Sequence, residues 1–387
     1  MTPTLNIIGF FFEIEGTPRS FRTLELTKGF CEAGYKVRLI LPNFNNRKFT
    51  HPNLEIIETP VGRFLEKTAS RVDPDLNRAD LQKHVMLLRL LGQKYLFPDI
   101  NLLWIRNAIK YICRRKIELN ADATLAIALP IAPVVLASRL KRAGYPLGKV
   151  IAEYGDPNPK ASLRGLPGKI SRAGERAVLA NVEEVVVNFP GGVPVFESLG
   201  FSPDKIHVIP HILPDSSNVK KWEQKNEKAL HYVYGGAVYG ERDIAKLIRA
   251  IKQLRKEGGQ QTLTILTSLE HLDDSLRAEA GEYLILRQKV SPEEYRKLLI
   301  NFDAAINFIP SKKVHLPSKR MDFAIVGIPV FEIFCGDSEV DLMNKMREGR
   351  FPRPDCENVF TRSQAIESYA KILFDEHHYH KSARSMG

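Results

Sequence analysis

The chain has 387 residues, of which 44% are hydrophobic and 26% are charged, and its formal net charge at pH 7 is +11. This length exceeds one ordinary core and predicts two domains of roughly 150–200 residues each. The four cysteines lack the spacing of a disulfide framework or a zinc site. No apolar run approaches the ~20 residues that span a bilayer, and no basic stretch precedes the first apolar run, so we expect a cytoplasmic protein without a signal or transmembrane segment.

A basic segment accounts for most of the excess charge. Residues 63–116 contain 12 Lys and Arg but 5 Asp and Glu, interleaved with bulky apolar residues such as Leu87, Leu91 and Trp104. Residues 61–116 could therefore rest on an anionic membrane surface, which would make the protein peripheral at the inner face. A solvated helical face with its own core side is an equal alternative. Nucleic acid is not expected as a partner, because no recognition motif accompanies the charge.

The first half of the chain alternates short apolar runs with helical patterns. Such runs, bounded by Gly, Pro and polar turns, are typical of strands buried on both faces of a parallel sheet. Strands are predicted at 6–12, 37–41, 54–59, 123–129, 149–153, 184–187 and 206–211, and helices at 20–33, 133–143 and 170–180. The fold class is therefore α/β with a Rossmann-like opening. Its first loop contains Gly16 but not G-x-G-x-x-G, so a dinucleotide fingerprint is absent.

The second half restarts the same α/β pattern after a polar, linker-like stretch at 214–228. Strands are predicted at 230–234, 262–266, 282–286, 288–290, 302–308 and 328–334, and helices at 243–257, 292–299, 318–326 and 362–377. We expect a first domain at 1–213 and a second at 228–370, with 371–387 as the end of the terminal helix and a tail.

The stretch LPSKRMDFAIVGIPVF, residues 316–331, is the strongest candidate for a functional site. Ser318 is a helix-start signal, and Gly-Ile-Pro is a helix stop. The first turn carries Lys319 and Arg320 instead of the acidic residues that suit the positive end of a helix, which indicates a bound anion. Asp322 follows on the same turn. The predicted strand that follows this helix would place the bound anion at the carboxyl edge of a parallel sheet.

Two other loops follow predicted strands. In the sequence GGAVYGER, the backbone at Gly236 can approach an anion closely, and Arg242 could bind phosphate oxygens in bidentate fashion. Asp156 lies in the loop after strand 149–153, where its carboxylate could bind an acceptor hydroxyl or assist its deprotonation. An ordinary Asp-Pro turn is the alternative for Asp156.

The pattern P-S-K, a short helix with an acidic residue, G-x-P and a hydrophobic strand resembles the donor-site segment of glycosyltransferases with the GT-B fold. The likeness is closest to their large retaining, family 4-like group. It implies two Rossmann-like domains facing a cleft, with a C-terminal helix crossing back to the first domain. It also implies a nucleoside-diphosphate-sugar as substrate, a sugar or lipid-linked acceptor, retention of configuration and no metal or other cofactor.

The resemblance also implies roles for individual residues. Gly16, followed by Arg19 or Arg22, would touch the donor phosphates or the acceptor. Donor binding would fall to the residues Gly16, Gly236, His315, Ser318, Lys319 and Asp322. Catalysis would fall to Lys319, Arg242 and Asp156.

The chain departs from the family's donor motif, which has two glutamates eight positions apart. Asp322 can stand for the second glutamate, but the first position is Val314. Either other groups such as His315 and Lys319 hold the donor sugar, or the chain belongs to a diverged branch. A non-catalytic GT-B-like binding or scaffold protein is the alternative function.

Two strings have the composition of metal ligands. Asp73-Pro74-Asp75 has the D-x-D form that metal-dependent transferases use, but it does not follow a strand, and we interpret it as a turn. His377-His378-Tyr379-His380 lies near the C-terminus, where solvent exposure is expected. The sequence therefore predicts no metal site.

Overall fold

The computed structural model describes residues 2–14, 18–45, 48–62, 97, 101–128, 130–158, 163–213, 221–224, 230–236, 243–269, 274–278, 280–309, 319–354 and 359–374. The chain forms two compact units. The first unit consists of Met1–Ile212 and Phe360–Gly387, and the second of Leu213–Val359. Residues 360–370, which the sequence analysis assigned to the second domain, thus belong to the first unit.

A seven-stranded parallel sheet forms the centre of the first unit. Its strand order is β3-β2-β1-β4-β5-β6-β7. The strands are β1 (Thr4–Ile8), β2 (Lys36–Pro42), β3 (Leu54–Thr59), β4 (Ala123–Ile127), β5 (Lys149–Tyr154), β6 (Glu184–Val187) and β7 (Ile206–Val208). Successive side chains of β1 and β4 enter opposite cores, so both faces of the sheet are covered, as expected for parallel strands.

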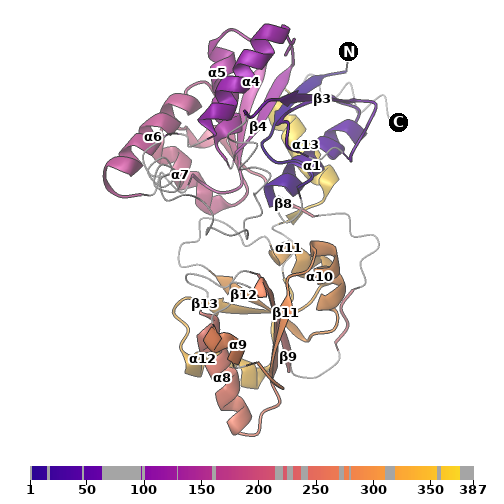
Figure 1. The fold of residues 1–387 in the computed structure, drawn as a ribbon, viewed down its shortest axis with the longest axis vertical. Coiled ribbons are helices and arrows are strands. Elements are labelled where there is room, and N and C mark those ends of the chain that lie inside the picture. Colours follow the sequence, from indigo (N-terminus) through magenta and orange to yellow (C-terminus); the bar gives the residue numbers. More distant parts are fainter. Residues whose placement is uncertain are drawn as a thin grey trace. The chain divides into compact units, whose positions relative to one another are not determined.

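Helices cover the two faces of this sheet (Figure 1). One face carries α4 (Leu102–Arg115), α5 (Ala132–Arg142), α6 (Gly165–Leu179) and α7 (Val193–Ser198). The other face carries α1 (Pro18–Glu32) and the terminal helix α13 (Arg362–Leu373). The short strands β8 (His211–Ile212) and β14 (Val359–Phe360) pair with each other. The C-terminal helix therefore returns to the first unit, which confirms that part of the predicted fold.

The second unit is built around a five-stranded parallel sheet of order β11-β10-β9-β12-β13. Its strands are β9 (His231–Gly235), β10 (Thr262–Thr267), β11 (Leu284–Gln288), β12 (Ala304–Ile309) and β13 (Val330–Phe334). Its helices are α8 (Ile244–Lys256), α9 (Asp274–Ala278), α10 (Pro292–Leu299), α11 (Lys319–Val326) and α12 (Glu339–Glu348). One core packs α8 and α12 against the sheet, and a second core packs α10 and α11.

Both sheets are doubly wound, and both reverse their strand order beside their first strand. The reversal lies between β1 and β4 in the first sheet and between β9 and β12 in the second. Open parallel sheets bind ligands outside the carboxyl ends of the strands at this point. The predicted α/β class with two Rossmann-like units is therefore confirmed, and the topology indicates where each unit would hold a ligand.

The first strand is shorter than predicted. We expected residues 6–12, but β1 ends at Ile8. Beyond that point the backbone bonds to a side chain instead of to a neighbouring strand. The side-chain oxygen of Asn45 accepts from the N–H of Phe12, and its amide group donates to the carbonyl oxygen of Phe10. Phe10 and Phe12 are buried nonetheless. The apolar run is thus a buried loop as well as a strand, and a pattern of hydrophobic residues alone does not separate the two.

Candidate functional site

Helix α11 of the second unit begins at Lys319, within one residue of the predicted start. Its end is the expected one, since the N–H of Gly327 donates to the carbonyl oxygen of Phe323 at 2.7 Å. The ammonium group of Lys319 lies 4.2 Å from the ring centroid of Tyr295 on α10. A cation held over an aromatic face in this way is restricted in position by the attraction between its charge and the ring.

The ring of Tyr295 also packs against the end of β9. A Cβ atom at Gly235 would lie 2.5 Å from Cε2 of that ring, closer than any real contact. Glycine is therefore required at this position, because it lets the backbone lie directly on the ring. Lys319 and the segment Gly235-Gly236 are thus brought together by Tyr295 at the carboxyl end of β9, next to the reversal of strand order.

Gly236 itself makes a contact that the sequence analysis did not foresee. Its N–H donates to the carbonyl oxygen of Leu266 at 3.0 Å, and its φ of +150° is one that glycine adopts far more readily than other residues. This N–H is occupied by the neighbouring strand. While this bond is made, the N–H of Gly236 is not available to a bound anion.

Asp322, one turn into α11, faces two cations. Its Oδ1 lies 3.0 Å from Nη1 of Arg296 on α10, and both side chains are 16% exposed. Burial raises the pKa of Asp322, while Lys319 and Arg296 act in the opposite direction without cancelling that rise. Arg296 thus takes up one face of the carboxyl group that was predicted to bind the donor.

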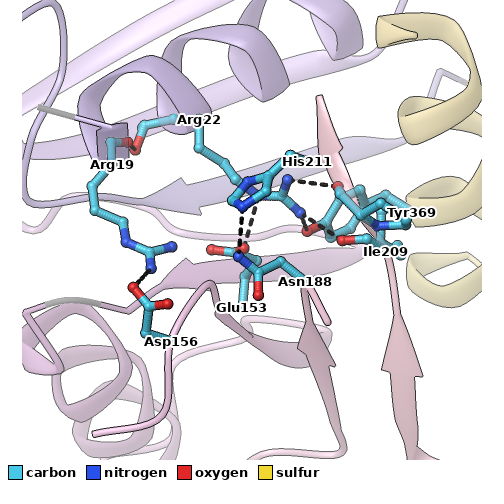
Figure 2. Close-up of polar contacts among 10 residues, drawn as sticks. Arg19, Arg22, Glu153, Asp156, Asn188, Ile209, His211 and Tyr369 are labelled. Atoms are coloured by element: carbon cyan, nitrogen blue, oxygen red, sulfur yellow. Dashed lines mark hydrogen bonds and ion pairs between the residues drawn. The ribbon is translucent and has the colours of Figure 1, made fainter. Parts of the chain in front are cut away.

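Asp156 of the first unit lies directly after β5, in the predicted loop. Its Oδ2 accepts from Nη2 of Arg19 at 2.7 Å (Figure 2). A Cβ atom at Gly155 would lie 1.5 Å from Nη1 of Arg19, so the guanidinium group lies flat against this glycine. Arg19 is 14% exposed and Asp156 is 42% exposed. The pair therefore presents a fixed carboxylate to solvent at the carboxyl edge of the sheet.

Arg22, one turn after Arg19, is buried. Its guanidinium group donates to the carbonyl oxygens of Ile209 and Pro210 and to the hydroxyl of Tyr369 on α13 (Figure 2). Its Nε lies 2.8 Å from Oε1 of Glu153, an ion pair outside hydrogen-bond geometry. The donors of Arg22 thus hold the first unit together, and Arg19 is the less buried of the two arginines.

Beside this ion pair, the amide of Asn188 lies 3.2 Å from Nε2 of His211 (Figure 2). Asn188 directly follows β6 and is buried, so this second polar contact lies at the same carboxyl edge as Asp156. If the amide nitrogen is the donor, His211 Nε2 is the acceptor and the ring proton sits on Nδ1.

Several predicted positions lie outside the described residues. They are Gly16, Arg242, His315 and Ser318, together with the strings 73–75 and 377–380. Across the part of the chain that is described, no cluster of three or more His, Cys, Asp and Glu side chains could hold a metal ion. None of the helices in that part has the length and apolar character needed to cross a bilayer.

Tyr295 and Arg296 are the functional candidates that sequence reasoning missed. Ser291 and Glu294 form a capping box, and its pattern predicts the start of α10 correctly. Which face of α10 meets α11 depends on how the two helices pack on the sheet. No local signal in the sequence marks the pair Arg296–Asp322.

Comparison with known proteins finds similar structures but no match by sequence. None of the protein-family models matches the chain, and no curated protein matches it either. Among solved structures, the lipopolysaccharide outer core galactosyltransferase WaaB matches with a TM-score of 0.52 and 11% identity, covering 99% of this chain and 100% of its own. A glycosyltransferase from Rickettsia africae matches with a TM-score of 0.52 and 11% identity, covering 96% of this chain and 93% of its own.

The glycotransferase of kitacinnamycin is similar to the same extent, with a TM-score of 0.50, 9% identity, and coverage of 96% of this chain and 95% of its own. Likeness at such low identity establishes the fold alone. The strand orders of the two sheets and the returning helix α13 agree with it. The chain therefore has the GT-B fold that these glycosyltransferases share.

Proposed function

We propose that this protein is a glycosyltransferase, which moves a sugar from a nucleoside-diphosphate-sugar to an acceptor hydroxyl. The observation that carries the proposal is the juxtaposition of Lys319 and the Gly235-Gly236 turn on the ring of Tyr295. This cationic corner lies at the carboxyl end of β9 in a GT-B fold, where open sheets bind nucleotides. A nucleoside diphosphate is a ligand whose negative charge matches such a corner.

The chemical task of such an enzyme is to stabilise the negative charge that grows on the departing diphosphate. A fixed cation does this with little reorganisation when it is held where the charge develops. The Tyr295 ring fixes the ammonium of Lys319, and the start of α11 adds the positive end of a helix dipole. Arg242 would add a second cation. We propose that these groups suffice without a metal ion.

The stereochemical course is proposed to be retention, through front-face attack assisted by the leaving phosphate. The first unit would then bind the acceptor. Asp156 is the candidate to orient the acceptor hydroxyl, because its carboxylate is held by Arg19 at 2.7 Å and is still exposed. The basic segment 61–116 suits a lipid-linked acceptor at an anionic membrane surface, and assembly of a polysaccharide or glycolipid would take place there.

A thermal-shift series with nucleoside diphosphates and their sugars tests the donor site. A ligand that binds only the folded state raises the melting temperature as its concentration rises. We expect a shift with one nucleotide and a smaller shift in Lys319→Ala, which should also lose turnover. Lys297→Ala on α10 is the matched control, because Lys297 is 72% exposed and pairs with Glu293 along its own helix. Full turnover by Lys319→Ala would refute the assignment.

A non-catalytic GT-B-like binding or scaffold protein is the second candidate. The observation that favours it is the pairing of Asp322 with Arg296, combined with Val314 at the first acidic position. A carboxylate held by an arginine is less free to bind a ribose or a sugar. This candidate predicts a thermal shift with a nucleotide, together with no hydrolysis of the donor and no transfer to any acceptor.

A further inference from the structure

The solvent face of α6 is apolar. Leu166, Ile170, Ala173 and Ala177 are all exposed, and their spacing of four, three and four residues places them in one stripe along the helix. Leu166 is 62% exposed and Ile170 is 37% exposed. A surface helix of a globular protein ordinarily shows the opposite arrangement, with its apolar stripe facing the core.

The buried face of α6 is mixed, because Val178 and Leu179 enter the core beside polar residues. It includes Ser171 and Glu175, which are 3% and 1% exposed. The apolar stripe is therefore not turned toward the core of the first unit. Of the eight large hydrophobic residues that are exposed in the described part of the chain, three lie within residues 163–170.

Cationic side chains border this stripe. Lys169 and Arg176 are exposed and lie seven residues apart, which places both along the same side of the stripe. Arg164 is exposed directly before the helix. The single acidic residue of α6, Glu175, is on the buried face. The exposed face thus combines large apolar groups with positive charge and has no acidic group of its own.

Phe97 and helix α4, two described parts of the basic segment 61–116, lie in the same layer as α6. The Phe97 ring lies against α6, since a Cβ atom at Gly174 would come within 2.4 Å of it. Helix α4, in the same layer, exposes Leu103 at its start and ends in Arg114 and Arg115. Helices α4, α5 and α6 all lie on the side of the sheet opposite α1 and α13 (Figure 1).

We propose that the exposed face of α6 is a membrane-docking surface, which rests in the interface of an anionic bilayer. Leu166 and Ile170 enter the boundary of the acyl chains, and Lys169 and Arg176 contact lipid phosphates. An apolar stripe bordered by cations is the composition that interfacial helices use. The net charge of +11 adds long-range attraction to such a surface. This proposal extends the membrane role included in the proposed function by naming the surface that makes contact.

Co-sedimentation of the full chain with lipid vesicles tests the proposal. We expect binding to vesicles of phosphatidylcholine mixed with phosphatidylglycerol, and much weaker binding to phosphatidylcholine alone. The double variant Leu166→Ser/Ile170→Ser should bind the mixed vesicles at least ten-fold more weakly. Lys169→Glu should weaken binding about five-fold or more, in line with the contribution of one basic residue near an anionic surface.

Two matched variants in the second unit serve as controls. Val340 is 62% exposed, as Leu166 is, so Val340→Ser removes an equally exposed apolar group. Lys256→Glu changes an exposed charge at the end of α8. Both should sediment with vesicles as the unmodified protein does. Equal losses in the controls and in the α6 variants would overturn the assignment, as would equal binding to charged and uncharged vesicles.

The same variants separate this inference from the proposed function. An α6 variant that loses vesicle binding should keep the melting shift with nucleotide, because the second unit is untouched. An unmodified protein that binds nucleotide but no vesicles would overturn the docking surface and leave the proposed function standing. Formation of a dimer that Leu166→Ser abolishes, without vesicle binding, would also overturn it, because the stripe would then be covered by a second copy of the chain.

Discussion

Glu175 on α6 is an acid buried beneath the loop that carries Asp156, and its replacement by glutamine should change how stability depends on pH. Its side chain is 1% exposed. The amide of Asn158 donates to Oε2 at 3.3 Å, and the hydroxyl of Tyr154 faces the carboxyl group without reaching hydrogen-bond geometry. Burial raises the pKa of Glu175 from 4.5 to about 7, although both neighbours act to lower it.

The sign and size of the effect follow from this rise. Between pH 4.5 and about 7 the folded protein retains a proton that the unfolded chain releases, so the free energy of unfolding falls as pH rises through that window. At ~1.4 kcal/mol per pH unit, the loss is on the order of 3 kcal/mol above pH 7. Glu175→Gln keeps the shape and the neutral charge of the protonated acid, and it does not lose stability in this way.

We therefore expect the melting curves of Glu175→Gln and the unmodified protein to differ least at the acid end of the range, near pH 5. Above pH 7.5 the variant should melt several degrees higher, since ~1 kcal/mol moves the melting temperature by about 2–4 °C in a domain of this size. Melts monitored by circular dichroism from pH 5 to 8.5 would measure the difference. Glu197→Gln, on the exposed surface of α7, is the control. A constant difference between variant and unmodified protein at every pH would refute the reasoning.

Three further substitutions test individual contacts. Gly155→Ala should displace the guanidinium of Arg19 and lower kcat. The melting temperature should change by at most about 2 °C, because the long side chain of Arg19 can move aside. An unchanged kcat would exclude a role for the Arg19–Asp156 ion pair. Tyr369→Phe removes one acceptor of the buried Arg22 and should cost about 1.5 kcal/mol in denaturant unfolding. Arg296→Met leaves its carboxylate partner on α11 without an arginine and should cost roughly 2–3 kcal/mol at pH 7.5 but less at pH 5, measured as melting temperatures.

Local signals allowed the regular elements to be predicted closely. The ranges of β3, β6 and α10 agree with the sequence analysis residue by residue, because each is a short apolar run or a capping box bounded by turn residues. Helix α6 was predicted to start at 170, but it starts at Gly165. The sequence Gly-Leu-Pro-Gly resembles a turn, yet proline is tolerated in the first turn of a helix, where its missing N–H has no partner to lose.

The polar contacts of the first unit could not be predicted in the same way. Arg19 and Arg22 stand one turn apart on α1, and nothing in the local sequence separates them. The structure gives them different roles, because the side chain of Arg22 enters the interior beside Glu153 while that of Arg19 lies along the loop at Asp156. This difference arises from the arrangement of β5, residues 209–210 and α13 around the helix. Those partners are up to 347 residues away in the chain.

The cationic corner of the second unit, formed by Lys319, Tyr295 and Gly235-Gly236, could be predicted in part. The start of α11 and the glycines after β9 were recognisable from helix signals and from composition. The link between them was not, because it consists of one aromatic ring on a third element. The position of the Lys319 ammonium depends on the ring of Tyr295, and the ring fits only because Gly235 has no side chain. Lys319, which sequence reasoning treats as a separate phosphate ligand, is therefore part of one packed arrangement with Tyr295 and with Gly235, the residue before the predicted Gly236.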